Sequence, residues 1–405
     1  MRQEPTCYSF LTYFDFWPKA FLLPFHLEVG CPARRFGLIN FEVACRGRPH
    51  LAGLVQAFEA KSNWSIRRCF NGRYAMGCFS RYALLPLVLL FASTMHGWAQ
   101  QTRLSVMVYR GGQNLPLFVA QEEGFFLKRG LSVDLINAPN ADELPKGLID
   151  GRWQIIHSTS DNAVKIVDVE KLDVALIIGG DNAHNHVIVQ KDIKSFADLK
   201  GKTIVLDGAD TGYAYVIYAI LEKYGLKKGD YNINLVGATP KRLEALLNDP
   251  NNKAGMINPP FSIQAVRAGL VDLGATVSFI GPYQGPAGYT RRSWAREHSD
   301  TLVDYLQSYI EAVRWTLDKA NRAKATEILA RRLSLTPEVA EDVYAIITGD
   351  AEGFARDGKF DIEGFKNVLA LRAAYEGKPL QDPQPYLDLS YYDRALRALN
   401  EGATK

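Results

Sequence analysis

Four short segments carry residue types that could bind a small molecule: YRGGQN (109–114), HSTSDN (157–162), DGADTGY (207–213) and NPPF (258–261). Glycines allow a backbone to approach a ligand closely, and Arg110 could form paired hydrogen bonds with a carboxylate or sulfonate. Hydroxyl groups and free N–H groups at the start of a helix favour anions. Tyrosines and Phe261 provide faces for a ring. These types predict a site for an organic anion with an aromatic or heterocyclic part.

The residues expected to bind this ligand come from the four segments and one later tyrosine. They are Tyr109, Arg110, Gln113, Asn114, Ser158, Thr159, Ser160, Asp161, Asp207, Asp210, Thr211, Gly212, Tyr213, Asn258, Pro259, Phe261 and Tyr283. Other interpretations stay open. The hydroxyl and acidic residues that begin helices could act only as caps, Arg110 could be an ordinary surface residue, and the aromatic residues could belong to the core. The aspartates would instead favour an amine or a pyrimidine.

Patterns that indicate catalysis or metal binding are weak. His184 and His186 would share a face of a strand, but no cysteine and no third ligand is indicated nearby. The glycine-rich segments match neither the phosphate-binding loop nor the dinucleotide-binding fingerprint, and no nucleophile elbow occurs. We therefore expect no catalytic residue, no metal and no cofactor, and leave a role for the two histidines open.

The elements that must position these segments alternate between strands and helices. Strands are predicted at 104–109, 131–136, 154–157 and 173–179, with helices between them, which indicates a parallel sheet with helices on its faces. A second series follows, with strands at 187–190, 203–206, 233–236, 254–257 and 272–278. It contains SFADLKGK (195–202), where Ser195 and Asp198 form an imperfect capping box. In such sheets ligands bind beyond the carboxyl ends of the strands, and all four segments fall there.

The two series resemble one another, and a helical tail follows them. KGLIDGRWQIIHSTSDN (146–162) and EALLNDPNNKAGMINPPF (244–261) both suggest helix, turn, short strand, polar loop and helix. Two similar α/β lobes are the simplest explanation, although the likeness is weak enough for chance to be a rival. From Arg291 onward the apolar spacing is almost entirely helical.

The first 99 residues differ from the rest of the chain. All five cysteines (Cys7, Cys31, Cys45, Cys69, Cys78) lie there. After Arg81, the apolar run 83–92 has the length of a signal-peptide core and about half that of a membrane span, and small residues precede Gln100. We expect a signal peptide at 76–99, cleaved after Ala99, and a periplasmic protein. A signal peptide should be N-terminal, so we expect 1–75 to be a non-native, poorly structured upstream extension.

The charge balance gives no indication of nucleic-acid binding. The whole chain has a formal charge of +3, but the part after residue 99 holds 36 basic and 39 acidic residues. A phosphate backbone requires a basic surface. A small-molecule partner fits this composition better.

Several segments resemble one family of bacterial binding proteins, those for nitrate, taurine, aliphatic sulfonates and thiamine-pyrimidine precursors. They are QNLPLFVAQEEGFFLKRGLSVDL (113–135), LIDGRWQIIHSTSDN (148–162), SFADLKGKTIVL (195–206), the most specific, and the helical stretch 293–329. The likeness covers about 103–400. It implies an α/β fold of the type II periplasmic-binding-protein kind, with two lobes and two hinge crossovers near 180–187 and 277–290.

The resemblance also implies the lobes and the function. Lobe I would hold 100–183 and 289–405, with the helical tail packed on it, and lobe II would hold 184–288. The chain would be a monomeric solute-binding component of an ABC importer, serving a permease and its ATPase. Two relatives are enzymes, a pyrimidine-precursor synthase with a cysteine-rich motif and a desulfinase with a cysteine nucleophile. The absence of cysteine after Cys78 disfavours that alternative. The stretch NDPNNKAGMINPP departs from the family's usual turn, so no particular ligand can be transferred.

Overall fold

The computed structural model describes residues 101–137, 140–182 and 184–402, which all belong to one compact unit, Phe91–Lys405. The expected upstream extension (1–75), the signal peptide with its cleavage site after Ala99, and the five cysteines lie outside the described residues. Within the described part, no helix combines the length and the apolar character needed to cross a membrane.

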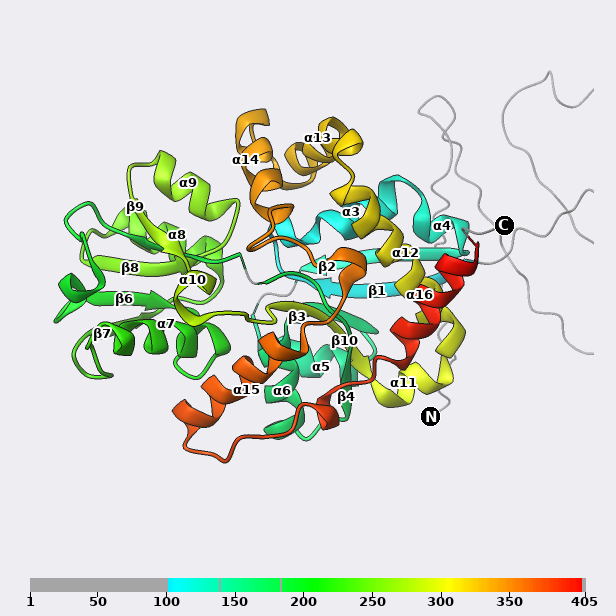
Figure 1. Cartoon of the computed structure of the whole chain (residues 1–405), viewed down its shortest axis with the longest axis horizontal. Helices are drawn as coiled ribbons and strands as arrows, with labels where there is room; N and C mark the ends of the chain where they lie inside the picture. The colour runs from blue at the N-terminus through cyan, green and yellow to red at the C-terminus, as the bar shows by residue number, and fades with distance from the viewer. Residues whose placement is uncertain (1–100, 138–139, 183, 403–405) are drawn as a thin grey trace, which may run out of the picture. The chain divides into compact units, whose positions relative to one another are not determined.

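The first of two sheets is built around the apolar strand β1 (Figure 1). β1 (Thr102–Val108) lies between β2 (Leu131–Asn137) and β3 (Ile155–Thr159) and is parallel to both. β10 (Pro286–Arg291) pairs antiparallel with β3, and β4 (Val174–Ile178) completes the order β2-β1-β3-β10-β4. Every residue of β4 is buried, as expected for an unbroken aliphatic run.

The second sheet has the order β7-β6-β8-β5-β9. β6 (Thr203–Leu206) is parallel to β7 (Asn232–Leu235) and β8 (Asn252–Ile257). β5 (His186–Val189) runs antiparallel to β8 and to β9 (Val271–Ala275). We call each sheet with the helices of its own series a lobe, and the first lobe also includes the tail after β10.

The two sheets have the same topology, which accounts for the resemblance between the two halves of the sequence. In each, the fourth strand in the order arrives from the other lobe and is antiparallel to its neighbours. The sequence does not predict β10, because PAGYTR contains proline and glycine, and Tyr289 is its only large apolar side chain. Pairing with β3 and β4, and not local propensity, determines this strand.

Two crossovers join the lobes, one between β4 and β5 and one before β10, as the resemblance implies. The Tyr283 N–H donates to Asn182 Oδ1 at 2.8 Å, so the crossovers contact one another. Pro286 and Gly288 pair with β3 in the first sheet. These residues of β10 therefore belong to the first sheet.

The helices of each series cover its sheet. The helical segment between β1 and β2 is interrupted at Gly124, whose φ of 72° a helix interior does not accommodate. Ser195 and Asp198 form the predicted capping box, with the Ser195 N–H donating to Asp198 Oδ2 at 2.8 Å. The elements are η1 (Gly112–Asn114), α3 (Leu115–Glu122), α4 (Phe125–Lys128), α5 (Glu143–Ile149) and α6 (Ser160–Asp168), then η2 (Phe196–Leu199), α7 (Gly212–Lys223), α8 (Thr239–Asn248), α9 (Phe261–Arg267) and α10 (Val277–Ile280).

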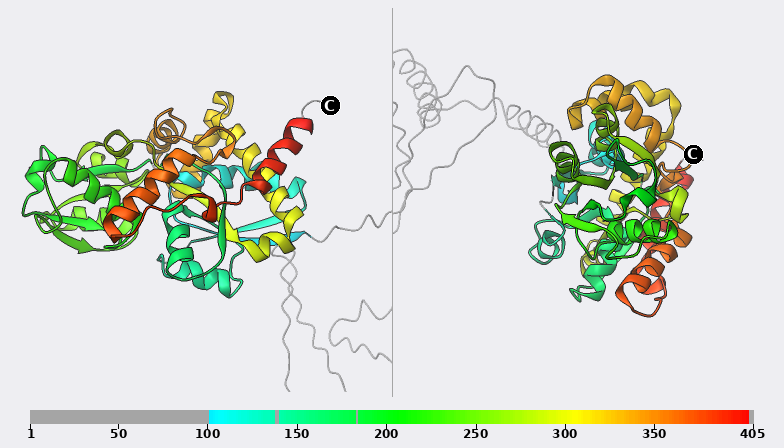
Figure 2. Two further views of the ribbon diagram at one scale, coloured as in Figure 1. Left: turned by 60° about the horizontal axis from the view of Figure 1, so that its bottom comes forward. Right: turned by 90° about the vertical axis from the view of Figure 1, so that its left-hand side faces the viewer.

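The tail after β10 is helical, as predicted, and most of it packs on the first lobe. α12 contacts α3, α4 and α16, and Leu302, Leu306 and Val313 of α12 are buried in that core. Two tail helices also contact the second lobe, α15 through α7 and α14 through α9 (Figure 2). The tail comprises α11 (Arg292–Glu297), α12 (Ser299–Leu317), η3 (Lys319–Asn321), α13 (Arg322–Leu333), α14 (Pro337–Ile347), η4 (Arg356–Gly358), α15 (Ile362–Glu376), η5 (Gln384–Tyr386) and α16 (Ser390–Gly402).

Candidate functional site

A cavity of about 530 Å³ lies between the two lobes. Its walls are loops that follow β1, β3 and β4 in the first lobe and β6, β7 and β8 in the second. This is the edge where open α/β sheets bind ligands. Of the residues expected to bind the ligand, those that line the cavity are Tyr109, Arg110, Gln113, Asn114, Ser158, Thr159, Asp161, Asp207, Thr211, Gly212, Tyr213 and Asn258.

Two expected residues, Ser160 and Tyr283, lie in the protein interior beside the cavity. The Ser160 hydroxyl donates to the Gln284 carbonyl oxygen at 2.6 Å, and its side chain is fully buried. Tyr283 is 2% exposed and belongs to the core shared by the lobes. Both residues hold the second crossover in place.

Three further expected residues also lie outside the cavity lining. The exposed Asp210 is 3.5 Å from Lys165 Nζ in an ion pair. Pro259 directs its carbonyl oxygen to the Gly112 N–H at 3.2 Å, in a contact between lobes. Phe261 begins α9 and packs against the small apolar core of the second lobe. Local sequence patterns do not reveal which side of a loop faces the cavity.

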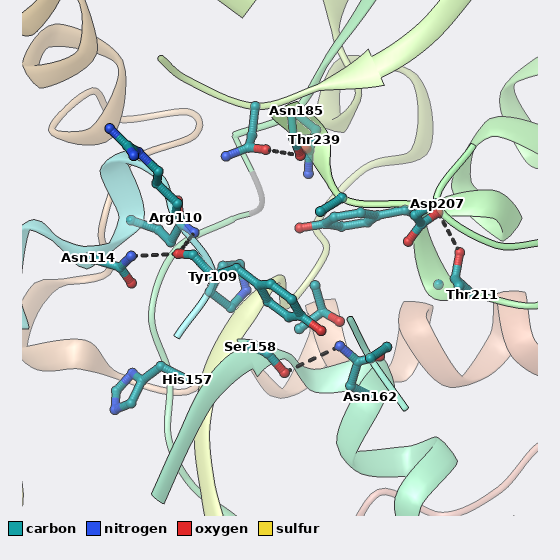
Figure 3. Close-up of a pocket in the computed structure, with 18 of the residues that line it drawn as sticks. Tyr109, Arg110, Asn114, His157, Ser158, Asn162, Asn185, Asp207, Thr211 and Thr239 are labelled. Atoms are coloured by element: carbon teal, nitrogen blue, oxygen red, sulfur yellow. Dashed lines mark hydrogen bonds between the residues drawn. The ribbon is translucent and has the colours of Figure 1, made fainter. Parts of the chain in front are cut away.

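The polar residues of the first lobe are arranged by hydrogen bonds within their own loops (Figure 3). Asn114 Nδ2 donates to the Tyr109 carbonyl oxygen at 2.6 Å. The Ser158 hydroxyl is 2.8 Å from the Tyr289 hydroxyl and accepts from Asn162 Nδ2 at 3.3 Å. These bonds hold the loops after β1 and β3 in place without a contribution from a ligand.

Arg110, the expected anion-binding residue, is exposed and partly engaged by the tail. Its Nη2 donates to the Leu333 carbonyl oxygen at the end of α13, at 2.7 Å. A guanidinium group has five N–H donors, so this bond leaves others for a ligand. The tail thus orients one basic side chain at the edge of the cavity.

Arg242, which the sequence analysis did not single out, is the more distinctive basic residue of the lining. It is 3% exposed, and its hydrogen bonds go to neutral oxygens: the Met256 carbonyl at 3.0 Å, the Gly237 carbonyl at 2.8 Å and the Thr239 hydroxyl at 2.8 Å. In the described part of the chain it forms no salt bridge. One N–H remains on each terminal nitrogen, the pattern that binds a carboxylate or sulfonate in pairs.

The environment of Arg242 also opposes its charge. Burial lowers the pKa of Arg242, and the nearby groups Asp207 and Tyr213 act in the opposite direction. A buried cation without a paired anion is unfavourable by several kcal/mol. An anionic ligand in the cavity would relieve that cost. The sequence feature that could have revealed Arg242 is its position, one turn into the helix that follows the carboxyl end of β7.

Acidic side chains in the cavity are largely committed to protein partners. Asp207 Oδ1 accepts from the Thr211 hydroxyl at 2.8 Å, and Thr211 also caps α7. Asp161 is 1% exposed, and its two oxygens accept from Arg372 Nη1 and from the Gly212 N–H, both at 2.7 Å. These bonds favour structural roles for Asp161 and Thr211, one of the interpretations left open above.

Tyrosine rings and a neutral histidine form part of the wall. Burial, with Asp207 adding to it, raises the pKa of Tyr109, and burial likewise raises the pKa of Tyr213. Both phenols therefore stay protonated and can donate hydrogen bonds. His157, which the sequence analysis did not select, is 2.8 Å from the Tyr305 hydroxyl, and burial lowers its pKa to about 3.

The two histidines near the first crossover do not share a face. His184 precedes β5, lines the cavity and lies 3.4 Å from Asp181 Oδ1. His186 begins β5 and instead lies 2.7 Å from Asp272 and 3.1 Å from Glu352. Across residues 101–137, 140–182 and 184–402, no three His, Cys, Asp or Glu side chains are arranged to hold a metal ion.

Sequence and structure comparisons are consistent with this geometry. Residues 112–251 match the family model described as NMT1/THI5 like. Among curated proteins, none matches the sequence.

Solved structures give a broader likeness. The ligand-binding component of an ABC-type import system from Staphylococcus aureus has 13% identity and a TM-score of 0.63, over 73% of this chain and 99% of that one. The periplasmic nitrate-binding protein NrtA from Synechocystis PCC 6803 has 14% identity and a TM-score of 0.63, over 74% and 89%.

A third example is the alkanesulfonate-binding protein SsuA from Xanthomonas axonopodis pv. citri, bound to MOPS. It has 16% identity and a TM-score of 0.56, over 72% of this chain and 98% of that one. Together with the cavity between two sheets of equal topology, these likenesses show that the chain has the two-lobed α/β fold of periplasmic binding proteins.

Proposed function

We propose that this chain is the extracytoplasmic solute-binding component of an ABC importer. The observation that carries the proposal is the cavity at the facing edges of two similar lobes, joined by two crossovers. In such a protein, hinge motion of the lobes encloses a solute in the cleft. The names of the structural neighbours, which include nitrate- and sulfonate-binding proteins, support the same role.

The ligand is an organic anion with a ring, bound by predicted residues of the cavity lining, among them Tyr109, Arg110 and Tyr213. The evidence for an anionic group is Arg242, a buried cation whose hydrogen bonds are all with neutral oxygens. Tyr109 and Tyr213 supply ring faces and protonated hydroxyl donors. A cavity of about 530 Å³ is within the range that encloses small organic ligands.

The remaining parts of the proposal concern location and partners. The protein is a periplasmic monomer that delivers its solute to a permease and its ATPase and performs no catalysis. Its mature chain starts at Gln100, lobe I holds 100–183 and the tail, and lobe II begins at His184. N-terminal sequencing of the natural product tests the cleavage site, and a mature terminus upstream of Met76 would contradict it.

A ligand screen tests the receptor role against the enzyme alternative. Carboxylates, sulfonates including MOPS, phosphates and nitrate are added separately, and thermal unfolding is measured. A receptor is stabilised by its ligand, and the ligand is recovered chemically unchanged. Conversion of the stabilising compound into a product would contradict the proposal.

A further inference from the structure

Helix α15 joins the two lobes at one side of the cavity. It belongs to the tail after β10, yet it contacts both α6 of the first lobe and α7 of the second. In Figure 1 it runs from the region of α6 toward α7, and Figure 2 shows it crossing the same two regions from another side. α14 of the tail also reaches the second lobe, but through α9.

The contact between α15 and α7 is aromatic. The ring of Tyr375 stacks on Tyr215 with centroids 5.7 Å apart and meets the edge of Tyr218 at 5.6 Å. The Tyr375 hydroxyl donates to Glu222 at 2.8 Å. Aromatic packing of this kind adds to the stabilisation that area burial provides. The end of α15 is therefore firmly attached to the second lobe.

A buried charge pair attaches the middle of α15 to the first lobe and, through it, to the second. Arg372 is 5% exposed and Asp161 1% exposed, and their side chains are 2.7 Å apart. The other oxygen of Asp161 accepts from the Gly212 N–H at the start of α7, at 2.7 Å. Asp161 thus connects α6, α15 and α7 at one point.

The same helix holds the second crossover. Asn367 Nδ2 donates to the Ile280 and Pro282 carbonyl oxygens at 3.0 and 2.9 Å. At Gly364, an added Cβ would lie 2.6 Å from the backbone nitrogen of Gln284, so the helix lies directly against the crossover.

On the other side of the cavity, the contacts between α9 and α14 are fewer, although Ile263 of α9 packs on the first-lobe core and His186 pairs with Glu352 near the first crossover. The Gly112 N–H donates to the Pro259 carbonyl oxygen at 3.2 Å. Arg267 of α9 is 2.7 Å from Asp342 of α14, but these side chains are 45% and 52% exposed. Exposed ion pairs contribute little to stability. If one side separates, this side opens at the lower free-energy cost.

We propose that α15 is a strap that keeps the lobes joined through α7, so that the cavity opens between α9 and α14. Solute then enters and leaves on the α9–α14 side, with the α7–α15 contact acting as the pivot. This inference concerns the opening of the proposed solute site. The order in which the two sides open is nevertheless measurable without any ligand.

Amide hydrogen exchange in the full wild-type chain measures that order at two hydrogen bonds. The Gly112 N–H reports the α9–α14 side, and the Gly212 N–H reports the α7–α15 side. Opening at the α9–α14 side gives Gly212 a protection factor at least about tenfold higher than that of Gly112. Equal protection, or higher protection of Gly112, would overturn the proposal.

Two variants at Tyr375 test the strap itself. Tyr375→Ala removes the ring stack, and Tyr375→Phe keeps the ring and loses only the hydroxyl. The alanine variant is expected to lower Gly212 protection at least about tenfold while the buried Ile156 keeps its protection, and the phenylalanine variant to lower it less than about threefold. Unchanged Gly212 protection in the alanine variant, or an equal loss at Ile156, would count against a separate strap.

Ligand binding provides an independent result. Absence of binding by every compound in the screen would remove the proposed receptor role and leave the order of opening as measured. Conversely, binding of an anion together with fast exchange at Gly212 would support the receptor role and contradict the proposal that α15 is a strap.

Discussion

Asp161 and Arg372 form a buried ion pair that joins a cavity loop to the helical tail, with 2.7 Å between the carboxylate and guanidinium groups. Burial raises the pKa of Asp161 and opposes the charge on Arg372, whereas the adjacent Asp161 and Glu376 raise the pKa of Arg372. Asp161 is therefore a fastening residue whose oxygens are already occupied, although its position in a polar loop suggested ligand binding.

Asp161→Asn is expected to lower the free energy of unfolding by about 3 kcal/mol, because it leaves a buried guanidinium with a weakened partner. Asp210→Asn is the matched control, since Asp210 pairs with Lys165 at the surface and its side chain is 71% exposed. The control should change stability by less than about 0.5 kcal/mol. Urea unfolding at pH 7 measures both, and equal losses would contradict the structural role of Asp161.

Arg242→Gln is expected to weaken binding of the best anion from the ligand screen at least about tenfold, since a charge-assisted hydrogen bond contributes about 1.5–3 kcal/mol. Arg110→Ala should also weaken it, by at least about 1.5 kcal/mol if Arg110 binds the anion directly. Lys241→Ala is the control, an exposed neighbour that also lines the cavity. Calorimetric titration gives the affinities.

The affinities of the Arg242 and Arg110 variants test the two residues independently. If the affinity of Arg242→Gln is unchanged, Arg242 does not bind the anion. Affinity unchanged in Arg110→Ala would leave that residue to its bond with the Leu333 carbonyl. Circular dichroism of each variant establishes that the protein is folded, because Arg242 also bonds to two carbonyl groups of its own lobe.

His186 is expected to stabilise the protein in a defined pH window. Burial disfavours its charged form, but hydrogen bonds with Asp272 and Glu352 outweigh burial and raise its pKa to about 9. The unfolded value is about 6.5, so the folded state binds the extra proton between these values. The contribution, about 3 kcal/mol, is complete below pH 6.5 and is lost as the pH rises through 9.

The measurement is the free energy of unfolding of the wild type and of His186→Asn from pH 6 to pH 9.5. The difference between them should shrink as the pH rises. His298→Asn, at an exposed position, is the control for replacing an imidazole by an amide. A difference that stays constant with pH would mean that packing, and not charge, accounts for the effect of His186.

His157 is expected to lower the free energy of unfolding as the pH falls, which is the opposite of the effect of His186. Its pKa in the folded protein is lowered to about 3 by burial, so below pH 6.5 the unfolded chain binds a proton that the folded protein does not. Stability should fall by about 1.4 kcal/mol per pH unit as the pH decreases from 6 toward 4. His157→Gln should remove this part of the slope, and parallel pH profiles for the two proteins would contradict it.

Much of the fold is encoded in local patterns, and the exceptions are instructive. The aliphatic run of β4 and the capping residues Ser195 and Asp198 are recognisable without tertiary information. β10 is not, because its pairing with β3 and β4 overrides a sequence that contains proline and glycine. The same limit explains the break at Gly124, where one positive φ divides an otherwise regular helical pattern.

The candidate site was predictable at the level of loops and not of side chains. The rule that ligands bind beyond the carboxyl ends of strands selected the loops that contain Tyr109, Ser158 and Asp207. It could not separate Ser158, which faces the cavity, from Ser160, which faces the interior. It also missed Arg242, whose significance depends on burial and on the identity of its hydrogen-bond partners.

Native mass spectrometry of the protein isolated from its own cells tests the central proposal most directly. The account predicts one bound, anionic compound of small mass, which dissociates on denaturation, is unchanged by prolonged incubation with the protein, and binds again when added back. Isolation with no compound bound, together with no binding from a small-molecule extract of the same cells, would contradict the receptor role. So would recovery of the compound in a chemically altered form.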